Sequence, residues 1–300
     1  MRKAILIGLD CAAPDLVFSR FINRLPNLRR MMRLGVYGEL ESCDPPITIP
    51  AWSVMTSSKS PGILGLYGFR HRKGSSYRDV WIASSNRVKV RRIWDCVADA
   101  GGKSCIVGVP PSYPPFPLDG WLVGCFITPD TNREYTHPPS LRDEITKLVG
   151  DYPVDVEFRI EDKRGLIKDI REMTKKHFEV VRHLIRTRDW RLFMFVEIGL
   201  DRVHHAFWKY FDETHHLHEP GNEFENVMEE YYVYLDQELG ELLKIAEDDT
   251  VVLVASDHGG KPMRGAFCIN SWLEKQGLLR LKKPAQGIIR LEDADVDWGK

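Results

Sequence analysis

Three acidic residues of this chain each follow an apolar run and could serve as metal ligands. Asp10 ends KAILIGLD, Asp201 follows LFMFVEIGL, and Asp257 follows TVVLVAS. A carboxylate at the end of a buried strand is costly unless a cation or a hydrogen-bond donor meets it. One such Asp alone is more often a helix cap or a turn former. Only the three together indicate a metal site.

Two of these acidic residues have a histidine nearby at a spacing that suits shared coordination. His205 comes four residues after Asp201, so both side chains would lie on one face of a helical turn. His258 directly follows Asp257 in SDHGG, where two glycines allow backbone to come close. An i,i+4 pair also occurs as a surface hydrogen bond, and the sequence leaves that alternative open. Carboxylates with imidazoles suit zinc, with manganese as the alternative.

A hydroxyl that could act as a nucleophile lies in PPITIPAWSVMTS. Thr48 comes two residues before Pro50, and proline is favoured at the first position of a helix, predicted here to continue through AWSVMTS. A hydroxyl at a helix N-terminus lies among unpaired amide groups and the positive end of the dipole, which favour a phosphate and an alkoxide. The alternative is an ordinary threonine cap without a catalytic role.

The elements that must position these residues are visible as apolar runs and helical periodicity. Strands are predicted at 3–9, 104–109, 121–127, 191–198 and 250–255. Helices are predicted near 91–101, 164–188 and 222–247. The alternation predicts a doubly wound, mostly parallel α/β sheet with helices on both faces, whose strands are buried on both faces and carry ligands beyond their carboxyl ends. We expect one domain over 1–300, with a loop-rich excursion or small lid at about 127–165 and an exposed connection at 212–224.

Composition restricts the partners and the location. With 42 basic and 43 acidic residues, the chain has no overall field that would draw it to nucleic acid or to anionic lipid. Six cysteines without a CxxC pair are expected to be reduced, buried thiols. The opening apolar run is too short for a signal peptide, and no apolar stretch approaches the roughly 18 residues of a membrane span. We therefore predict a cytoplasmic protein without membrane or nucleic-acid partners. The sequence does not determine the oligomeric state.

The four motifs GLDCAAPD, TIPAW, DRVHH and SDHGG, in this order, resemble the type I phosphodiesterase and nucleotide pyrophosphatase branch of the alkaline phosphatase superfamily. The resemblance implies a doubly wound α/β fold, two divalent ions, a small phosphorylated substrate, and a threonine that is transiently phosphorylated. Carried over by motif, one metal would be held by Asp10, Thr48, Asp257 and His258. The other metal would be held by Asp201 and His205. His204 is a candidate to hydrogen-bond a metal ligand without binding the metal itself.

The chain departs from the family pattern at one point. The family has a further histidine after the Asp-His pair, and none follows His258 here. The resemblance therefore implies either a C-terminally incomplete chain or an incomplete second metal site. Two hypotheses follow: a metal-dependent phosphohydrolase acting through a phosphothreonine, or a truncated or degenerate homologue that binds a metal or a phosphorylated ligand without turnover. A phosphate-binding P-loop at AGGKS is excluded because its first glycine position holds Val97.

Overall fold

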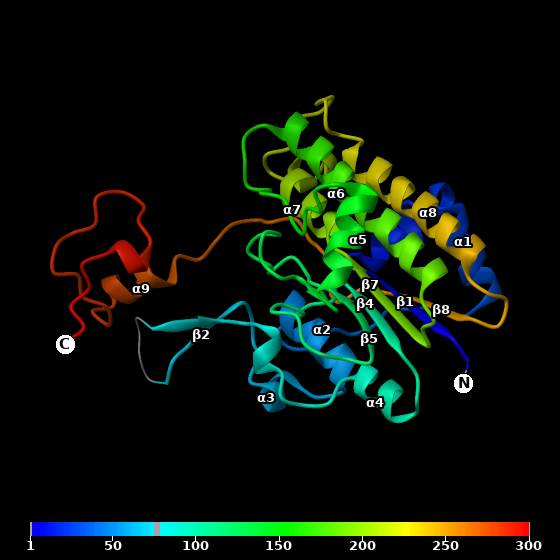
Figure 1. The fold of residues 1–300 in the computed structure, drawn as a ribbon. Helices are drawn as coiled ribbons and strands as arrows, with labels where there is room; N and C mark the ends of the chain where they lie inside the picture. The colour runs from blue at the N-terminus through cyan, green and yellow to red at the C-terminus, as the bar shows by residue number, and fades with distance from the viewer. Residues whose placement is uncertain (1, 75–78, 300) are drawn as a thin grey trace.

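A six-stranded sheet forms the centre of the computed structural model, which describes residues 2–74 and 79–299 (Figure 1). In order across the sheet, the strands are β6 (Thr136–His137), β5 (Gly120–Val123), β4 (Ser104–Val107), β7 (Leu192–Glu197), β1 (Ala4–Leu9) and β8 (Val251–Ala255). Neighbouring strands are parallel except for β5 and β6, which are antiparallel. All five predicted strands are present, and the mostly parallel α/β sheet is confirmed.

The central strands are apolar along their length because both of their faces are covered. In β7, Phe193 and Phe195 point into one buried cluster, while Met194 and Val196 point into another on the opposite face. Every residue of β7 is buried. This two-sided burial explains why the strand reads as a continuous hydrophobic run.

Strand β8 departs from the expected two-sided burial. It lies at the edge of the sheet, and Val251 and Leu253 are 54% and 53% exposed. The prediction that this strand is buried on both faces is therefore wrong for the described part of the chain. The apolar run correctly predicts a strand, whereas the burial of that strand depends on which elements lie beside it.

Helices cover both faces of the sheet, as predicted (Figure 1). One layer contains α1 (Pro26–Leu34), α5 (Ser140–Val149), α6 (Lys163–Thr187), α7 (Gly199–Phe211) and α8 (Val227–Ile245). The other contains α2 (Thr48–Ser57), α3 (Pro61–Leu64) and α4 (Ile93–Asp99). The described residues also form four single helical turns: Leu16–Arg20, Ile22–Arg24, Ser85–Arg87 and Leu291–Asp293.

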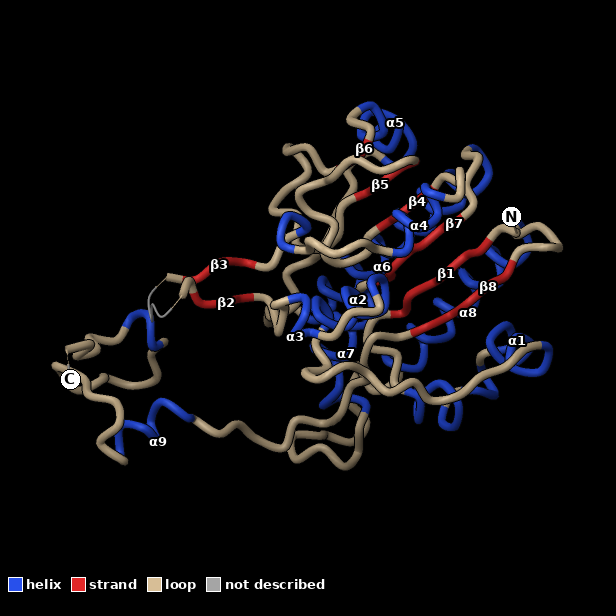
Figure 2. The backbone as a smooth tube through the Cα atoms, turned by 90° about the horizontal axis from the view of Figure 1, so that it is seen from below, coloured by secondary structure: helices blue, strands red, loops and turns tan. Residues whose placement is uncertain are grey.

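Two segments lie away from this layered body (Figure 2). One is the hairpin of β2 (Arg70–Arg72) and β3 (Val80–Ile82), and the other is the C-terminal segment that contains α9 (Ile269–Lys275). The excursion predicted at 127–165 contributes β6 to the sheet and α5 to a helical layer, while residues 151–162 contain neither helix nor strand. The connection at 212–224 also has no helix or strand.

The cysteines are only partly as expected. No cysteine is paired in a disulfide within the described chain. Cys11, Cys105 and Cys125 are buried, but Cys96 and Cys268 are exposed, so the expectation of buried thiols is wrong for these two. No helix within 2–74 and 79–299 has the length and apolar character needed to cross a bilayer.

Candidate metal centre

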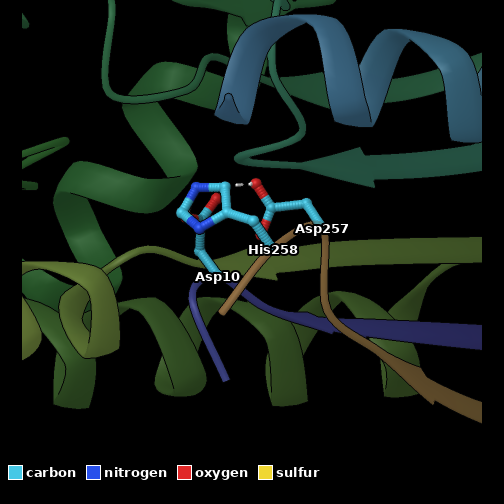
Figure 3. Close-up of side chains that lie close together, drawn as sticks. All are labelled: Asp10, Asp257 and His258. Atoms are coloured by element: carbon cyan, nitrogen blue, oxygen red, sulfur yellow. Dashed lines mark ion pairs between the residues drawn. The ribbon is translucent and has the colours of Figure 1, made fainter. Parts of the chain in front are cut away.

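Two adjacent parallel strands bring together ligands that are about 250 residues apart in sequence. Gly8 of β1 is in register with Ala255 of β8, so the residues that follow each strand emerge at the same edge. There, Asp10, Asp257 and His258 each offer a ligand atom, and these atoms lie within 4.8 Å of one another (Figure 3). Within the described chain, no other group of three or more His, Cys, Asp or Glu residues meets this condition.

The ligand atoms converge on one nitrogen, Nε2 of His258. It lies 3.3 Å from Oδ2 of Asp257, 3.7 Å from Oδ1 of Asp10 and 3.0 Å from Oγ1 of Thr48. Oxygen and nitrogen ligands lie roughly 2.0–2.2 Å from zinc, so tetrahedral neighbours are about 3.3–3.6 Å apart. The observed separations are close to this spacing, so the four side chains fit a shared divalent ion.

In Asp10 and in Asp257, one carboxylate oxygen accepts a hydrogen bond from the described part of the chain and the other does not. Oδ2 of Asp10 accepts a hydrogen bond from Nε1 of Trp52 (2.8 Å), and Oδ1 of Asp257 accepts one from the backbone N–H of Cys11 (3.2 Å). Among the described residues, the remaining Asp10 Oδ1 and Asp257 Oδ2 are buried and have no hydrogen-bond partner. Such oxygens are expensive to bury without a cation.

The pKa values of the two carboxyl groups record this cost. Burial raises the pKa of Asp10 well above its usual range, and the negative charges of Asp257 and Asp201 raise it further. Burial likewise raises the pKa of Asp257, to about 6, although the nearby His258 opposes this shift. A divalent ion would supply the positive charge that both groups lack.

Trp52 reaches Asp10 because Gly8 has no side chain. A Cβ on Gly8 would lie 2.4 Å from the Trp52 ring, so only glycine lets the indole pack against β1 at this point. Trp52 is fully buried and is the fifth residue of α2. Sequence reasoning missed this supporting role. The one available signal is that Trp52 follows Thr48 by four residues, which places both on one face of the helix.

Helix α2 begins at Thr48, two residues earlier than predicted. Pro50 is therefore the third helical residue and not the first, and the extended residue Ile47 precedes the helix. The correction keeps Thr48 in the first turn, where backbone N–H groups have no acceptor within the helix. Pro50 has no backbone N–H, so it adds no unpaired donor to that turn.

The second predicted pair lies on the first turns of α7. Glu197 fixes the start of this helix, since its two carboxylate oxygens accept from the N–H groups of Gly199 (2.8 Å) and Leu200 (3.0 Å). One turn further, Nε2 of His205 lies 3.5 Å from Oδ1 of Asp201. Burial lowers the pKa of His205, although Asp201 opposes the shift. The neutral imidazole is the form that binds metals.

Comparison with known proteins now identifies the family. The sequence profile of the type I phosphodiesterase / nucleotide pyrophosphatase family matches residues 4–297. The chain belongs to this family. Its predicted membership of this family is thereby confirmed.

Solved structures support the fold of this family member. The chain is similar to phosphonoacetate hydrolase from Sinorhizobium meliloti 1021 in complex with phosphonoformate, with a TM-score of 0.64, 17% identity and coverage of 93% of this chain and 64% of that chain. The complex of the same hydrolase with phosphonoacetate gives a TM-score of 0.63, 17% identity and coverage of 96% and 66%. The chain thus spans about two thirds of this relative, and at this identity the likeness shows an alkaline phosphatase-like fold. No curated protein matches the sequence.

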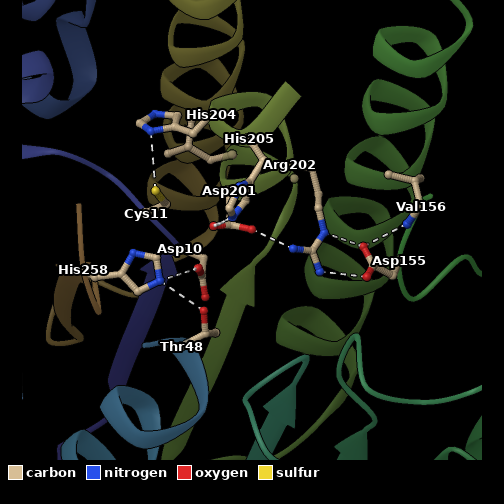
Figure 4. Close-up of polar contacts among 12 residues, drawn as sticks. Asp10, Cys11, Thr48, Asp155, Val156, Asp201, Arg202, His204, His205 and His258 are labelled. Carbon is tan, nitrogen blue, oxygen red and sulfur yellow. Dashed lines mark hydrogen bonds and ion pairs between the residues drawn. The ribbon is translucent and has the colours of Figure 1, made fainter. Parts of the chain in front are cut away.

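His204, the neighbour of His205 in the family motif, points away from the other ligands (Figure 4). Its Nδ1 lies 3.4 Å from Sγ of Cys11, and its Nε2 lies 3.0 Å from the hydroxyl of Tyr232. Burial lowers the pKa of His204 to about 3, with further lowering from His205 and His258. Both ring nitrogens of His204 therefore have a partner, which agrees with a structural role beside Cys11 and not with metal coordination.

Proposed function

We propose that this chain carries the catalytic site of a metal-dependent phosphohydrolase, with Thr48 as the nucleophile and a small phosphorylated molecule as the substrate. The observation that supports it most is the convergence on Nε2 of His258 of one hydroxyl and two buried carboxylate oxygens that lack a hydrogen-bond partner among the described residues. Family membership supports the same class of reaction.

A metal-free relay of Thr48, His258 and an Asp would need a different arrangement. In such a triad the hydroxyl bonds one ring nitrogen and the carboxylate orients the other. Here both carboxylates and Thr48 face Nε2, whereas Nδ1 of His258 lies 3.2 Å from the backbone oxygen of Gly259. One proton on Nε2 cannot serve three acceptors, which favours coordination of an ion.

The proposed reaction assigns a task to each part of the site. Bound divalent ions, zinc with manganese as the alternative, would lower the pKa of the hydroxyl and neutralise charge on the phosphoryl oxygens. Oγ1 of Thr48 loses its proton, attacks phosphorus and forms a phosphothreonine, while the bond to the leaving oxygen breaks and that oxygen takes up a proton. The free amides in the first turn of α2 hold the phosphoryl oxygens. Water then attacks phosphorus, releases phosphate and restores the hydroxyl.

We further propose two ions, held by Asp10, Thr48, Asp257 and His258 and by the pair Asp201 and His205. The second set contains only two of the described side chains, which is why a non-catalytic, metal-binding homologue stands as the alternative function. The cytoplasmic location and the absence of nucleic-acid and membrane partners stay predictions from the sequence.

The test compares Thr48→Ala and Thr48→Ser with Ser57→Ala, which removes a hydroxyl from the last residue of the same helix. Nitrophenyl phosphomonoester and phosphodiester substrates are assayed with zinc or manganese, and metal content is measured on each protein. We expect Thr48→Ala to lose at least about 10³-fold in turnover, Thr48→Ser to retain part of it, and Ser57→Ala to match the wild type. Wild-type rates in a folded, metal-loaded Thr48→Ala would exclude the nucleophile. Wild-type protein that binds one ion per chain without turnover would support the alternative.

A further inference from the structure

Arg202 connects the second metal-binding pair to a loop that sequence reasoning treated only as part of a lid. Its Nη1 donates to Oδ2 of Asp201 (2.6 Å), while Nε and Nη2 donate to the two oxygens of Asp155 (2.7 Å each) (Figure 4). All three nitrogens of the guanidinium are therefore engaged. The side chain of Arg202 is 7% exposed, so these ion pairs are largely removed from water.

The same loop also contacts the other member of the pair. The Phe158 ring lies 5.2 Å from the His205 ring and 4.5 Å from the guanidinium carbon of Arg202. Phe126 packs on the guanidinium at 5.1 Å. Residues 155–158 thus reach Asp201 through Arg202 and reach His205 directly.

We propose that Arg202, held by Asp155, is a positioning residue that presents Asp201 to a divalent ion through Oδ1 alone. Because Oδ2 is occupied by Arg202, Oδ1 is the oxygen that faces Nε2 of His205, at 3.5 Å. A carboxylate without this partner could rotate about its χ2 angle, and a ligand that must be ordered on binding weakens the site. This inference rests on the two-metal function proposed above.

Asp155 has a separate electrostatic task in this arrangement. A guanidinium paired with Asp201 alone would be free to take both of its oxygens in a bidentate pair, which is the geometry that Arg and carboxylates favour. Asp155 already holds two of the nitrogens and shares the positive charge. Oδ1 of Asp201 is therefore not taken by the guanidinium and stays available to bind the ion.

The test uses zinc titration against a chromophoric chelator, which resolves two binding steps in a two-metal protein. His205→Ala identifies the step that belongs to the Asp201–His205 pair. We expect Asp155→Asn and Arg202→Met to weaken that step by roughly 10–100-fold, as is typical when the hydrogen-bond partner of a metal ligand is removed, while the other step is unchanged. Glu144→Gln, which removes the carboxylate partner of Arg188 and His183 between α5 and α6, is the control and should alter neither step.

The outcomes separate this inference from the function it rests on. A wild-type protein without a second binding step would overturn both proposals. A second step that is unchanged in folded Asp155→Asn and Arg202→Met, or two steps weakened equally, would overturn the positioning role alone. If Arg202→Met fails to fold because Asp201 is left buried without its partner, Asp155→Asn decides, since it keeps the guanidinium and the side-chain shape.

Discussion

Replacing Asp257 by Asn should make the metal-free protein more stable at neutral pH, although it removes a proposed metal ligand. Burial raises the pKa of Asp257 from its ordinary 3.8 to about 6 in the folded chain. A shift of about two units corresponds to roughly 3 kcal/mol, at 1.36 kcal/mol per unit. Asn can still accept from the N–H of Cys11, so the substitution removes the charge and keeps the hydrogen bond.

The sign of the pH dependence follows from the raised pKa. The folded state binds the proton more tightly than the unfolded state, so the contribution of Asp257 to stability is fully present below pH 3.8 and is lost as pH rises through about 6. At pH 7.5 the metal-free wild type therefore carries the whole cost, and Asp257→Asn carries none. The difference in unfolding free energy should approach roughly 3 kcal/mol at pH 7.5 and shrink toward pH 4.

The assay is urea unfolding in the presence of a chelator at several pH values, repeated with saturating zinc. Zinc should reverse the order, because an ion that binds only the folded state stabilises the wild type more. Asp236→Asn is the matched control: this buried carboxylate accepts from the N–H groups of Asn27 (3.0 Å) and Leu28 (2.8 Å), so the Asn variant should be less stable than the wild type at pH 7.5. A metal-free Asp257→Asn that is less stable than the wild type at pH 7.5 would refute the reasoning.

Three further substitutions address the support of the site. Trp52→Phe removes the donor to Oδ2 of Asp10, which would carry its charge when zinc is bound. A hydrogen bond to a charged group is worth about 1.5–3 kcal/mol, so urea unfolding of the zinc-loaded protein should show a loss of about that size, and zinc titration should show weaker binding at the Asp10 site. Gly8→Ala places a methyl group 2.4 Å from the Trp52 ring and should lower the unfolding free energy by about 1–3 kcal/mol, whereas Gly38→Ala, whose Cβ meets nothing within 4 Å, should have little effect in the same thermal melts. His204→Phe removes a group whose pKa is lowered to about 3, so it should leave the pH–rate profile between pH 5 and 8 unchanged; a shifted profile would contradict a neutral, non-ligand His204.

Much of the fold is predictable from the sequence because it depends on local patterns. An apolar run that must be buried on both faces, such as LFMFVE in β7, is distinct from its surroundings without any knowledge of its neighbours. Strand β8 carries an equally apolar run, VVLVA, but it is partly exposed because it lies at the sheet edge. Edge position is a property of the whole topology and leaves no local mark.

The candidate ligands are predictable for a similar reason, since they sit at strand ends or at i,i+4 spacing. The residues that hold them in place are less visible. Arg202 and Asp155 are 47 positions apart, and Trp52 and Asp10 are 42 apart. No periodicity connects such pairs, and an Arg beside an Asp in sequence has many ordinary surface explanations. These contacts become readable only when the fold places the partners together.

The position of β1 between β7 and β8 has a consequence for synthesis of the chain. Strand β1 (Ala4–Leu9) pairs with Leu192–Glu197 and Val251–Ala255, both made much later, and with no nearer strand among the described residues. At about 5–20 residues per second, its first partner emerges roughly 10–40 s later. During that interval an apolar strand with two open edges is exposed, which favours early capture by a chaperone and late, cooperative closure of the sheet.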